Sequence, residues 1–230
     1  MDYKAFTLAE VLITLGIIGI VAAITLPALI GKYKEKETVT AVKVSYTIFS
    51  QALLRLANDY GSMSAIAPNS WEEGDDNAAL KENANITIRA LSKYLKAFRT
   101  CDSNNDCMAD NYKTLDGSKT YNWDKYSNLQ TGILANGVSF WILNNCGNEN
   151  SEPNKACGQI GFDINGRKKP NILGHDFFWF AIRNNGQIAI TKSEEEIKLQ
   201  CSLTSKKEYN GYKCSSYIMI HENMDYLKGN

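Results

Sequence analysis

The chain has 230 residues, with 25 basic and 25 acidic side chains, so its formal net charge at pH 7 is zero. This length suits one domain with an appendage. The charge balance argues against a nucleic acid or another polyanion as the main partner, because such binding requires a basic excess or a basic face. We interpret the short basic clusters at 167–169 and 206–207 as solvated surface.

The first predicted element is an apolar segment that extends from Phe6 to Ile30. Its roughly 25 residues, at about 1.5 Å each in a helix, would exceed the ~30 Å hydrocarbon core of a bilayer. The segment carries a single charged side chain, Glu10, whereas a soluble helix would show polar residues at every turn. We therefore predict a membrane span.

Three interpretations of this span compete. A cleaved secretory signal, with Val21-Ala22-Ala23 as its cleavage site, needs a basic leader and an apolar run of about 7–15 residues. Here the leader is barely basic and the apolar run is longer. A plain signal anchor gives no reason for Glu10, because a carboxylate is costly in the apolar part of a bilayer. The third interpretation depends on the sequence around Glu10.

The sequence from Lys4 to Leu12, Lys-Ala-Phe-Thr-Leu-Ala-Glu-Val-Leu, resembles the N-terminal signal of type IV pilins and type II secretion pseudopilins. The resemblance implies that a prepilin peptidase cuts between Ala5 and Phe6 and that the Phe6 amine is then N-methylated. Glu10 would take the fifth place of the mature chain, as the glutamate of that family does. Pro27 falls where such pilins carry a helix-breaking proline. Ala5 departs from the family, which usually has glycine before the cut.

This resemblance implies a structural subunit of a type IV pilus or type II secretion pseudopilus rather than an enzyme. The implied partners are the prepilin peptidase, other pilin or pseudopilin subunits, the inner-membrane assembly platform and, before assembly, membrane lipid. In a filament, the Glu10 carboxylate would pair with the Phe6 ammonium of a neighbouring subunit, because each charge is costly alone in apolar surroundings. The alternative to a filament subunit is a monomeric, membrane-anchored surface binding domain. The alternative to the charge pair is a Glu10 side chain that lies at the level of the headgroups.

An amphipathic stretch follows at 31–61. Its apolar side chains step by three and four residues, a helical period that predicts packing on a sheet. These side chains are Val39, Val42, Tyr46, Phe49, Leu53, Leu56 and Tyr60. Gly61 suits the end of the helix, and Pro27 should loosen its first half locally by removing one hydrogen bond. The sequence thus suggests a leader at 1–5, a membrane-spanning helix at 6–30, an amphipathic helix at 31–61 and a head at 62–230.

The sequence of the head predicts an α+β fold. In this fold a small antiparallel sheet of four or five strands is covered by the long helix, as in pilins. A short helix is expected at Ile86–Phe98. Asn-Gly between apolar runs is the strongest short signal for a hairpin. The predicted strands lie at 132–143, as a hairpin around Asn136-Gly137, at 160–164, and at 177–183 and 187–191, as a hairpin around 184–186.

All six cysteines lie beyond residue 100, and none shows the close Cys-x-x-Cys spacing of a zinc site. They fall into three local pairs: Cys101 with Cys107, Cys146 with Cys157, and Cys201 with Cys214. We expect these pairs to be disulfides formed in an oxidising compartment. Six cysteines allow about 15 connectivities, so proximity only favours this pairing. The alternative is a set of reduced cytosolic thiols.

Two features disagree about the orientation of the span. Lys32, Lys34 and Lys36 follow it and only Lys4 precedes it, so the positive-inside rule would keep the head in the cytoplasm. The cysteine pairs and the cleavage signal favour the opposite side. We therefore expect a single-pass protein of the inner (cytoplasmic) membrane with an extracytoplasmic head, which later joins a pilus or pseudopilus in the periplasm or at the cell surface.

The segment before 177 carries candidate calcium ligands, because Asp163, Asn165 and Asp176 offer hard oxygen atoms. Their spacing departs from an EF-hand, and the alternative is turn formation by Asn-Gly and Pro-Asn. We otherwise expect no cofactor. The chain has two histidines, His175 and His221, and no nucleotide-binding, zinc-protease or hydrolase motif, so we expect no catalytic activity.

Overall fold

The computed structural model describes residues 7–66, 78–95, 98–101, 104–122, 129–146 and 152–229. The chain divides into two units, Met1–Thr38 and Val39–Asn230. One helix, α1 (Leu8–Tyr60), begins in the first unit and ends in the second. The long N-terminal helix that the sequence predicts is therefore confirmed, and the boundary between the units falls inside the predicted amphipathic stretch.

In the second unit, α1 buries one face. Val42, Phe49, Leu53 and Leu56 are fully buried, at the helical spacing that the sequence predicts. Tyr60, at the end of the predicted stripe, is 40% exposed because the helix ends there. The next residue, Gly61, has a φ of +91°, a left-handed conformation that glycine adopts without strain.

The described part of the head contains a six-stranded antiparallel sheet in the order β1-β4-β5-β6-β7-β8. From β4 onward, each strand pairs with the next one along the chain. Its strands are β1 (Phe98–Thr100), β4 (Gln130–Leu134), β5 (Ser139–Asn144), β6 (Ala156–Asp163), β7 (Phe177–Arg183) and β8 (Ile188–Ala189). A separate pair consists of β2 (Tyr112–Lys113) and β3 (Thr120–Tyr121).

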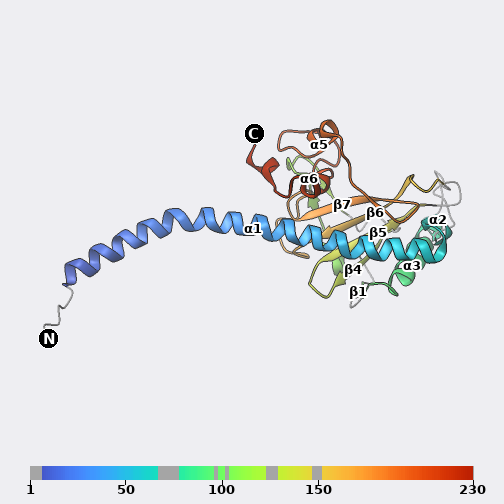
Figure 1. The fold of residues 1–230 in the computed structure, drawn as a ribbon, viewed down its shortest axis with the longest axis horizontal. Coiled ribbons are helices and arrows are strands. Elements are labelled where there is room, and N and C mark those ends of the chain that lie inside the picture. The colour runs from blue at the N-terminus through green and yellow to red at the C-terminus, as the bar shows by residue number, and fades with distance from the viewer. Residues whose placement is uncertain are drawn as a thin grey trace. The chain divides into compact units, whose positions relative to one another are not determined.

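One face of the sheet packs against α1, which covers it (Figure 1). The ring of Phe49 lies 4.8 Å from that of Phe140 and 5.0 Å from that of Phe162. The ring of Tyr46 lies 5.5 Å from that of Phe180. Side chains alternate between the two faces of a strand, so every second residue of β5, β6 and β7 contributes to this core.

The opposite face of the sheet holds a second apolar cluster. Trp141, Phe177 and Trp179 pack together there, and Tyr112 covers them. Gly161 makes room for this cluster, since a Cβ atom at that position would lie 2.5 Å from the indole nitrogen of Trp141. Because both faces are covered, the central strands carry continuous apolar runs instead of alternating apolar and polar residues.

Short helices complete the head: α2 (Met63–Ile66), α3 (Ala78–Leu91), α4 (Asn104–Cys107), α5 (Glu194–Gln200), α6 (Cys214–His221) and the 3₁₀ helix η2 (Asp225–Lys228). The helix predicted at Ile86–Phe98 is wrong at both ends, because α3 begins at Ala78 and stops at Leu91, and Phe98 begins β1. Phe98 pairs with Leu134 of β4, so sheet pairing overrides the local helical pattern there.

The sheet also has more strands than the four or five predicted. The additional strand β1 has only three residues, and the last strand, β8, is shorter than predicted. The strand predicted at 160–164 instead begins at Ala156 and ends at Asp163. Both predicted Asn-Gly hairpins are confirmed, because Gly137 and Gly186 close the turns between β4 and β5 and between β7 and β8.

Candidate functional site

The first half of α1 exposes its apolar side chains. Every leucine, isoleucine and valine from Leu8 to Ile30 is at least 43% exposed. Among the described residues, α1 is the one helix long and apolar enough to cross a membrane, with a mean hydropathy of 2.5 in a window that contains no buried residue. So large an apolar surface needs cover from lipid or from other apolar helices.

The carboxylate of Glu10 caps the start of this helix. Its Oε2 accepts hydrogen bonds from the backbone nitrogen and the hydroxyl of Thr7, both at 2.8 Å. In return, the backbone nitrogen of Glu10 donates to the Thr7 hydroxyl at 3.2 Å. This is a capping box, in which a threonine and a glutamate three residues later satisfy each other's backbone groups. The second oxygen, Oε1, makes no hydrogen bond in the described part of the chain.

The other predicted residues of this segment differ in what the structure says of them. Ala5 and Phe6 lie outside the described residues, so the predicted pairing of Glu10 with a neighbouring Phe6 stays a prediction. Pro27 lies inside α1, which is continuous through it. Two further residues of the segment, Gly16 and Gly19, face open space, since a Cβ atom at either position would meet nothing within 4 Å.

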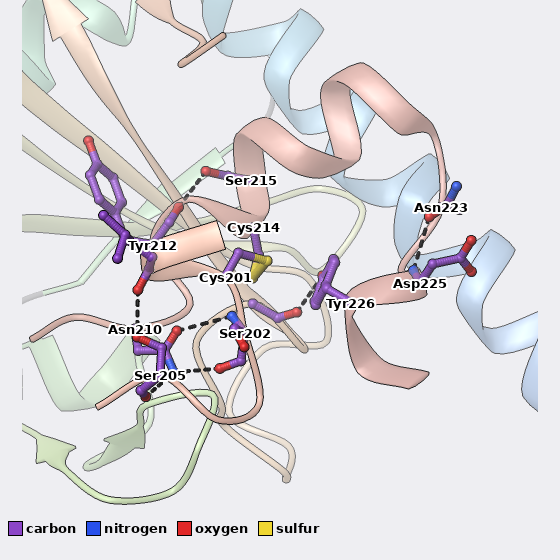
Figure 2. The surroundings of a disulfide bond; sticks show 12 residues. Cys201, Ser202, Ser205, Asn210, Tyr212, Cys214, Ser215, Asn223, Asp225 and Tyr226 are labelled. Atoms are coloured by element: carbon purple, nitrogen blue, oxygen red, sulfur yellow. Dashed lines mark hydrogen bonds between the residues drawn. A yellow bond between two sulfur atoms is a disulfide. The ribbon is translucent and has the colours of Figure 1, made fainter. Parts of the chain in front are cut away.

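The structure bonds all six cysteines in three disulfides: Cys101–Cys107, Cys146–Cys157 and Cys201–Cys214. These are the local pairs that proximity in the sequence favours. The 201–214 loop is also held by a buried asparagine, as Figure 2 shows. The amide nitrogen of Asn210 donates to the carbonyls of Ser202 and Ser205, both at 2.8 Å, and its oxygen accepts from the Ser202 backbone. The loop therefore keeps internal contacts besides its disulfide.

The three candidate calcium ligands lie together. The carboxylates of Asp163 and Asp176 accept hydrogen bonds within the turn, whereas the side-chain oxygen of Asn165 is buried without a hydrogen-bond partner among the described residues. Asp176, which is 2% exposed, accepts bonds of 2.7 Å from the backbone nitrogens of Asn171 and Ile172. It also accepts a 3.3 Å bond from the amide of Asn165. The described residues contain no group of three or more histidines, cysteines or carboxylates that could hold a metal ion. The contacts of the two carboxylates are those of the alternative interpretation, turn formation, and calcium binding stays a prediction.

Asp163 is the second carboxylate of this cluster and is fully buried. The Tyr112 hydroxyl donates to its Oδ2 at 2.5 Å, and the Asn165 backbone donates to its Oδ1 at 3.3 Å. Burial raises the pKa of Asp163 to about 8, which the bond from Tyr112 opposes and the charge of Asp176 reinforces. Burial also raises the pKa of Asp176. The two carboxylates therefore share a desolvated environment behind the β6–β7 connection.

Comparison with known families covers both units. Residues 1–26 match the prokaryotic N-terminal methylation motif, the cleavage and methylation signal of type IV pilins and pseudopilins. Residues 28–215, which are more than half of the chain, match a family of unknown function, DUF6613. The chain belongs to the DUF6613 family. Neither a curated protein nor a solved structure matches it.

The two matches divide this DUF6613 protein on either side of Pro27. The methylation motif takes in most of the exposed apolar part of α1, and the DUF6613 region takes in α1 from residue 28 onward and the whole described sheet. The predicted pilin-type signal and the pilin-like fold, a long N-terminal helix on an antiparallel sheet, are confirmed.

Sequence reasoning missed several residues that shape the DUF6613 head. Buried Asn144 donates from its amide to the Met63 carbonyl and the Thr87 hydroxyl, both at 3.1 Å. The bond between Tyr112 and Asp163 joins residues 51 positions apart, so no local pattern indicates it. The capping box did have a local signal, because Thr7-Leu8-Ala9-Glu10 fits the pattern of a threonine followed three residues later by a glutamate.

Proposed function

We propose that this DUF6613 protein is a structural, non-catalytic subunit of a type IV pilus or type II secretion pseudopilus. The observation that carries the proposal is a helix whose large apolar side chains from Leu8 to Ile30 are all exposed and whose first residues match the methylation motif. A prepilin peptidase would cut between Ala5 and Phe6, the Phe6 amine would be methylated, and an inner-membrane platform would assemble the subunits through their α1 helices.

The same proposal places the head outside the cytoplasmic membrane. Three local disulfides in the head support an oxidising compartment, such as the periplasm or the cell surface. The exposed half of α1 would lie in lipid before assembly and against the α1 helices of other subunits afterwards. Either environment removes the apolar surface from water.

Glu10 gives the proposed assembly its axial register. Its Oε2 is occupied by Thr7, whereas Oε1 is available to accept a hydrogen bond from the Phe6 ammonium of a neighbouring subunit. Both charges would be surrounded by apolar side chains, where an unpaired charge is strongly unfavourable. Every wrong stagger of two helices would leave charges unpaired, so the pair would select one stagger.

Two substitutions separate the capping role of Glu10 from its charge. Glu10→Gln removes the charge but keeps a side-chain oxygen that can accept from Thr7, since glutamine also forms capping boxes. Thr7→Ala removes the hydroxyl contacts but keeps the charge. In a host that has the peptidase and the assembly machinery, sheared and membrane fractions are blotted for each variant. We expect Glu10→Gln to remain in the membrane fraction and Thr7→Ala to appear in the sheared fraction.

The outcomes distinguish the proposal from a monomeric anchor. If the wild-type protein appears only in the membrane fraction although the machinery is present, the subunit proposal fails. If Glu10→Gln assembles as the wild type does, the charge pairing is wrong although the protein is a subunit. Mass spectrometry of the mature N-terminus provides an independent check, because processing should leave methylated Phe6 as the first residue in the wild type and both variants.

A further inference from the structure

The connection between β6 and β7 presents three consecutive cations. Arg167, Lys168 and Lys169 are all exposed. None of the three takes part in an ion pair or hydrogen bond in the described part of the chain. A charge run of this kind is often only a solvated surface. Two observations set this run apart from an ordinary charged surface: hydrogen bonds order the chain next to it, and it lies near the point where α1 enters the head.

The connection is held in place from beneath. The buried carboxylate of Asp176 accepts hydrogen bonds from the backbone nitrogens of Asn171 and Ile172, which follow the cations closely in the chain. The same segment joins β2, because the Lys113 backbone donates to the Asn171 carbonyl at 3.0 Å and accepts from Leu173 at 2.9 Å. The backbone that carries the three cations is therefore ordered before binding, and only their side chains would lose conformational freedom on binding.

The connection lies at the end of the head where α1 enters it, which we call the base of the head. The far end of β7, away from this connection, lies where α1 ends. There the Asn184 carbonyl accepts a hydrogen bond from the backbone nitrogen of Met63, three residues after the end of α1. Towards the start of β7, the ring of Phe180 lies against Tyr46. Phe177 is three residues earlier, about 10 Å further along the strand in the same direction. Residues 164–176, which precede Phe177, thus lie towards the N-terminal end of the buried part of α1.

A second set of contacts gives the same position. The hydroxyl of Tyr226 donates to the Gly174 carbonyl at 2.6 Å. Shortly before it, Glu222 forms an ion pair of 2.6 Å with Lys43 of α1. Asp225, between them, is paired with a lysine of its own helix. The exposed carboxylates of Glu222 and Asp225 are therefore each paired with a lysine, so these two do not offset the cations at 167–169.

We propose that in the membrane-inserted subunit Arg167, Lys168 and Lys169 contact anionic lipid headgroups and so dock the base of the head on the membrane until the subunit is assembled. The inference rests on the proposed function, because it requires the apolar part of α1 to lie in the bilayer. About nine residues separate Ile30 from Val39, so the base is tethered within about 30 Å of the end of the span in any conformation. Juxtamembrane cations bind anionic membranes by this attraction.

Lysine acylation in nanodiscs tests the docking. The full-length protein is inserted into discs of phosphatidylcholine alone or with phosphatidylglycerol, and a neutral acetylating reagent is applied. Mass spectrometry then gives the rates at Lys168 and Lys169 relative to Lys155. Lys155 is exposed and serves as the reference, because it lies at the end of the head away from the base. Its carbonyl accepts a hydrogen bond there from the backbone nitrogen of Asn184. We expect both relative rates to fall about fivefold in the anionic discs and to recover in 1 M salt, where the Debye length is about 3 Å.

Two charge variants complete the experiment. Arg167→Gln with Lys168→Gln leaves Lys169 as the reporter, and its protection in anionic discs should be lost. Arg55→Gln with Arg183→Gln removes the same number of charges away from the base and should leave the protection unchanged. Insertion with equal rates in both kinds of disc would overturn the docking and leave the proposed subunit intact, as expected if the cations instead meet a neighbouring subunit. Failure to insert into either disc would remove the proposed function and the docking together.

Discussion

The turn between β7 and β8 offers a direct measure of how tightly the sheet is fixed to α1. Gly186 has a φ of +81°, and a Cβ atom there would lie 2.5 Å from the Leu53 carbonyl oxygen and 2.8 Å from the Cβ of Ala57. Gly137 is its natural control, because it also follows an asparagine in a hairpin turn and has a φ of +86°, but its Cβ would meet nothing within 4 Å.

The two alanine variants share one penalty and differ in the other. A left-handed conformation costs an alanine about 1–2 kcal/mol, and both positions incur it. At Gly186 the new methyl group must also displace the backbone of α1, and overpacking of this kind costs roughly 1–3 kcal/mol more. We therefore expect Gly137→Ala to lower the free energy of unfolding by about 1–2 kcal/mol and Gly186→Ala by about 2–5 kcal/mol.

Thermal unfolding of the oxidised full-length protein in detergent provides the assay, followed by the near-UV circular dichroism of the buried Trp141 and Trp179. In a domain of this size, 1 kcal/mol corresponds to about 2–4 °C in Tm. Gly186→Ala should therefore melt at least about 2 °C, and up to about 12 °C, below Gly137→Ala. Equal shifts in the two variants would refute the reasoning, because the sheet could then move away from α1 at no cost.

Three further predictions concern the head. Asn144→Ala leaves the buried Met63 carbonyl without its donor, so urea unfolding should show a loss of about 1–3 kcal/mol, and no loss would contradict the bonded geometry. The pKa of Asp163 is raised to about 8 from about 3.9 in an unfolded chain, so the folded state holds an extra proton between these values. The free energy of unfolding should therefore fall as pH rises through this window, and Asp163→Asn should reduce the slope in urea titrations at pH 5 and pH 8. The Cys201–Cys214 disulfide joins residues 13 positions apart, and the Cys101–Cys107 disulfide joins residues 6 positions apart. Replacing both cysteines by alanine should therefore lower the free energy of unfolding by about 0.7 kcal/mol more at the longer bridge, through chain entropy. A larger loss at the shorter bridge would contradict this ranking.

Local patterns predicted the elements whose structure is decided locally. The exposed and buried halves of α1 follow from an apolar run and a helical period, and both Asn-Gly turns follow from glycine at a positive φ. The short strands β1, β2 and β3 could not be predicted, because two or three residues carry no period and their pairing depends on distant partners. Phe98, for example, is a strand residue because Leu134 lies opposite it.

The candidate functional site also has a part that local sequence predicts and a part that depends on residues distant in the chain. The motif around Glu10 is contiguous, so its resemblance to a pilin signal was visible in the sequence and agrees with the matched methylation motif. The hydrogen bonds that order the β6–β7 connection were not visible, because Tyr112 reaches Asp163 only after the sheet has formed. The sequence suggested oxygen ligands there, and in the structure the carboxylates of Asp163 and Asp176 accept hydrogen bonds from the chain itself, whereas the side-chain oxygen of Asn165 accepts none within the described residues.

The packing of α1 on the sheet also determines how the head would resist a pulling force. The aromatic contacts of Tyr46 and Phe49 lie on a helix whose axis follows β7, since Tyr46 meets Phe180 and Leu53 lies beside the turn at Gly186. A load applied at Val39 would therefore act on these contacts in shear and strain them together, whereas a load across the helix would separate them one at a time. The aromatic rings would then serve as the mechanical joint through which a subunit carries tension.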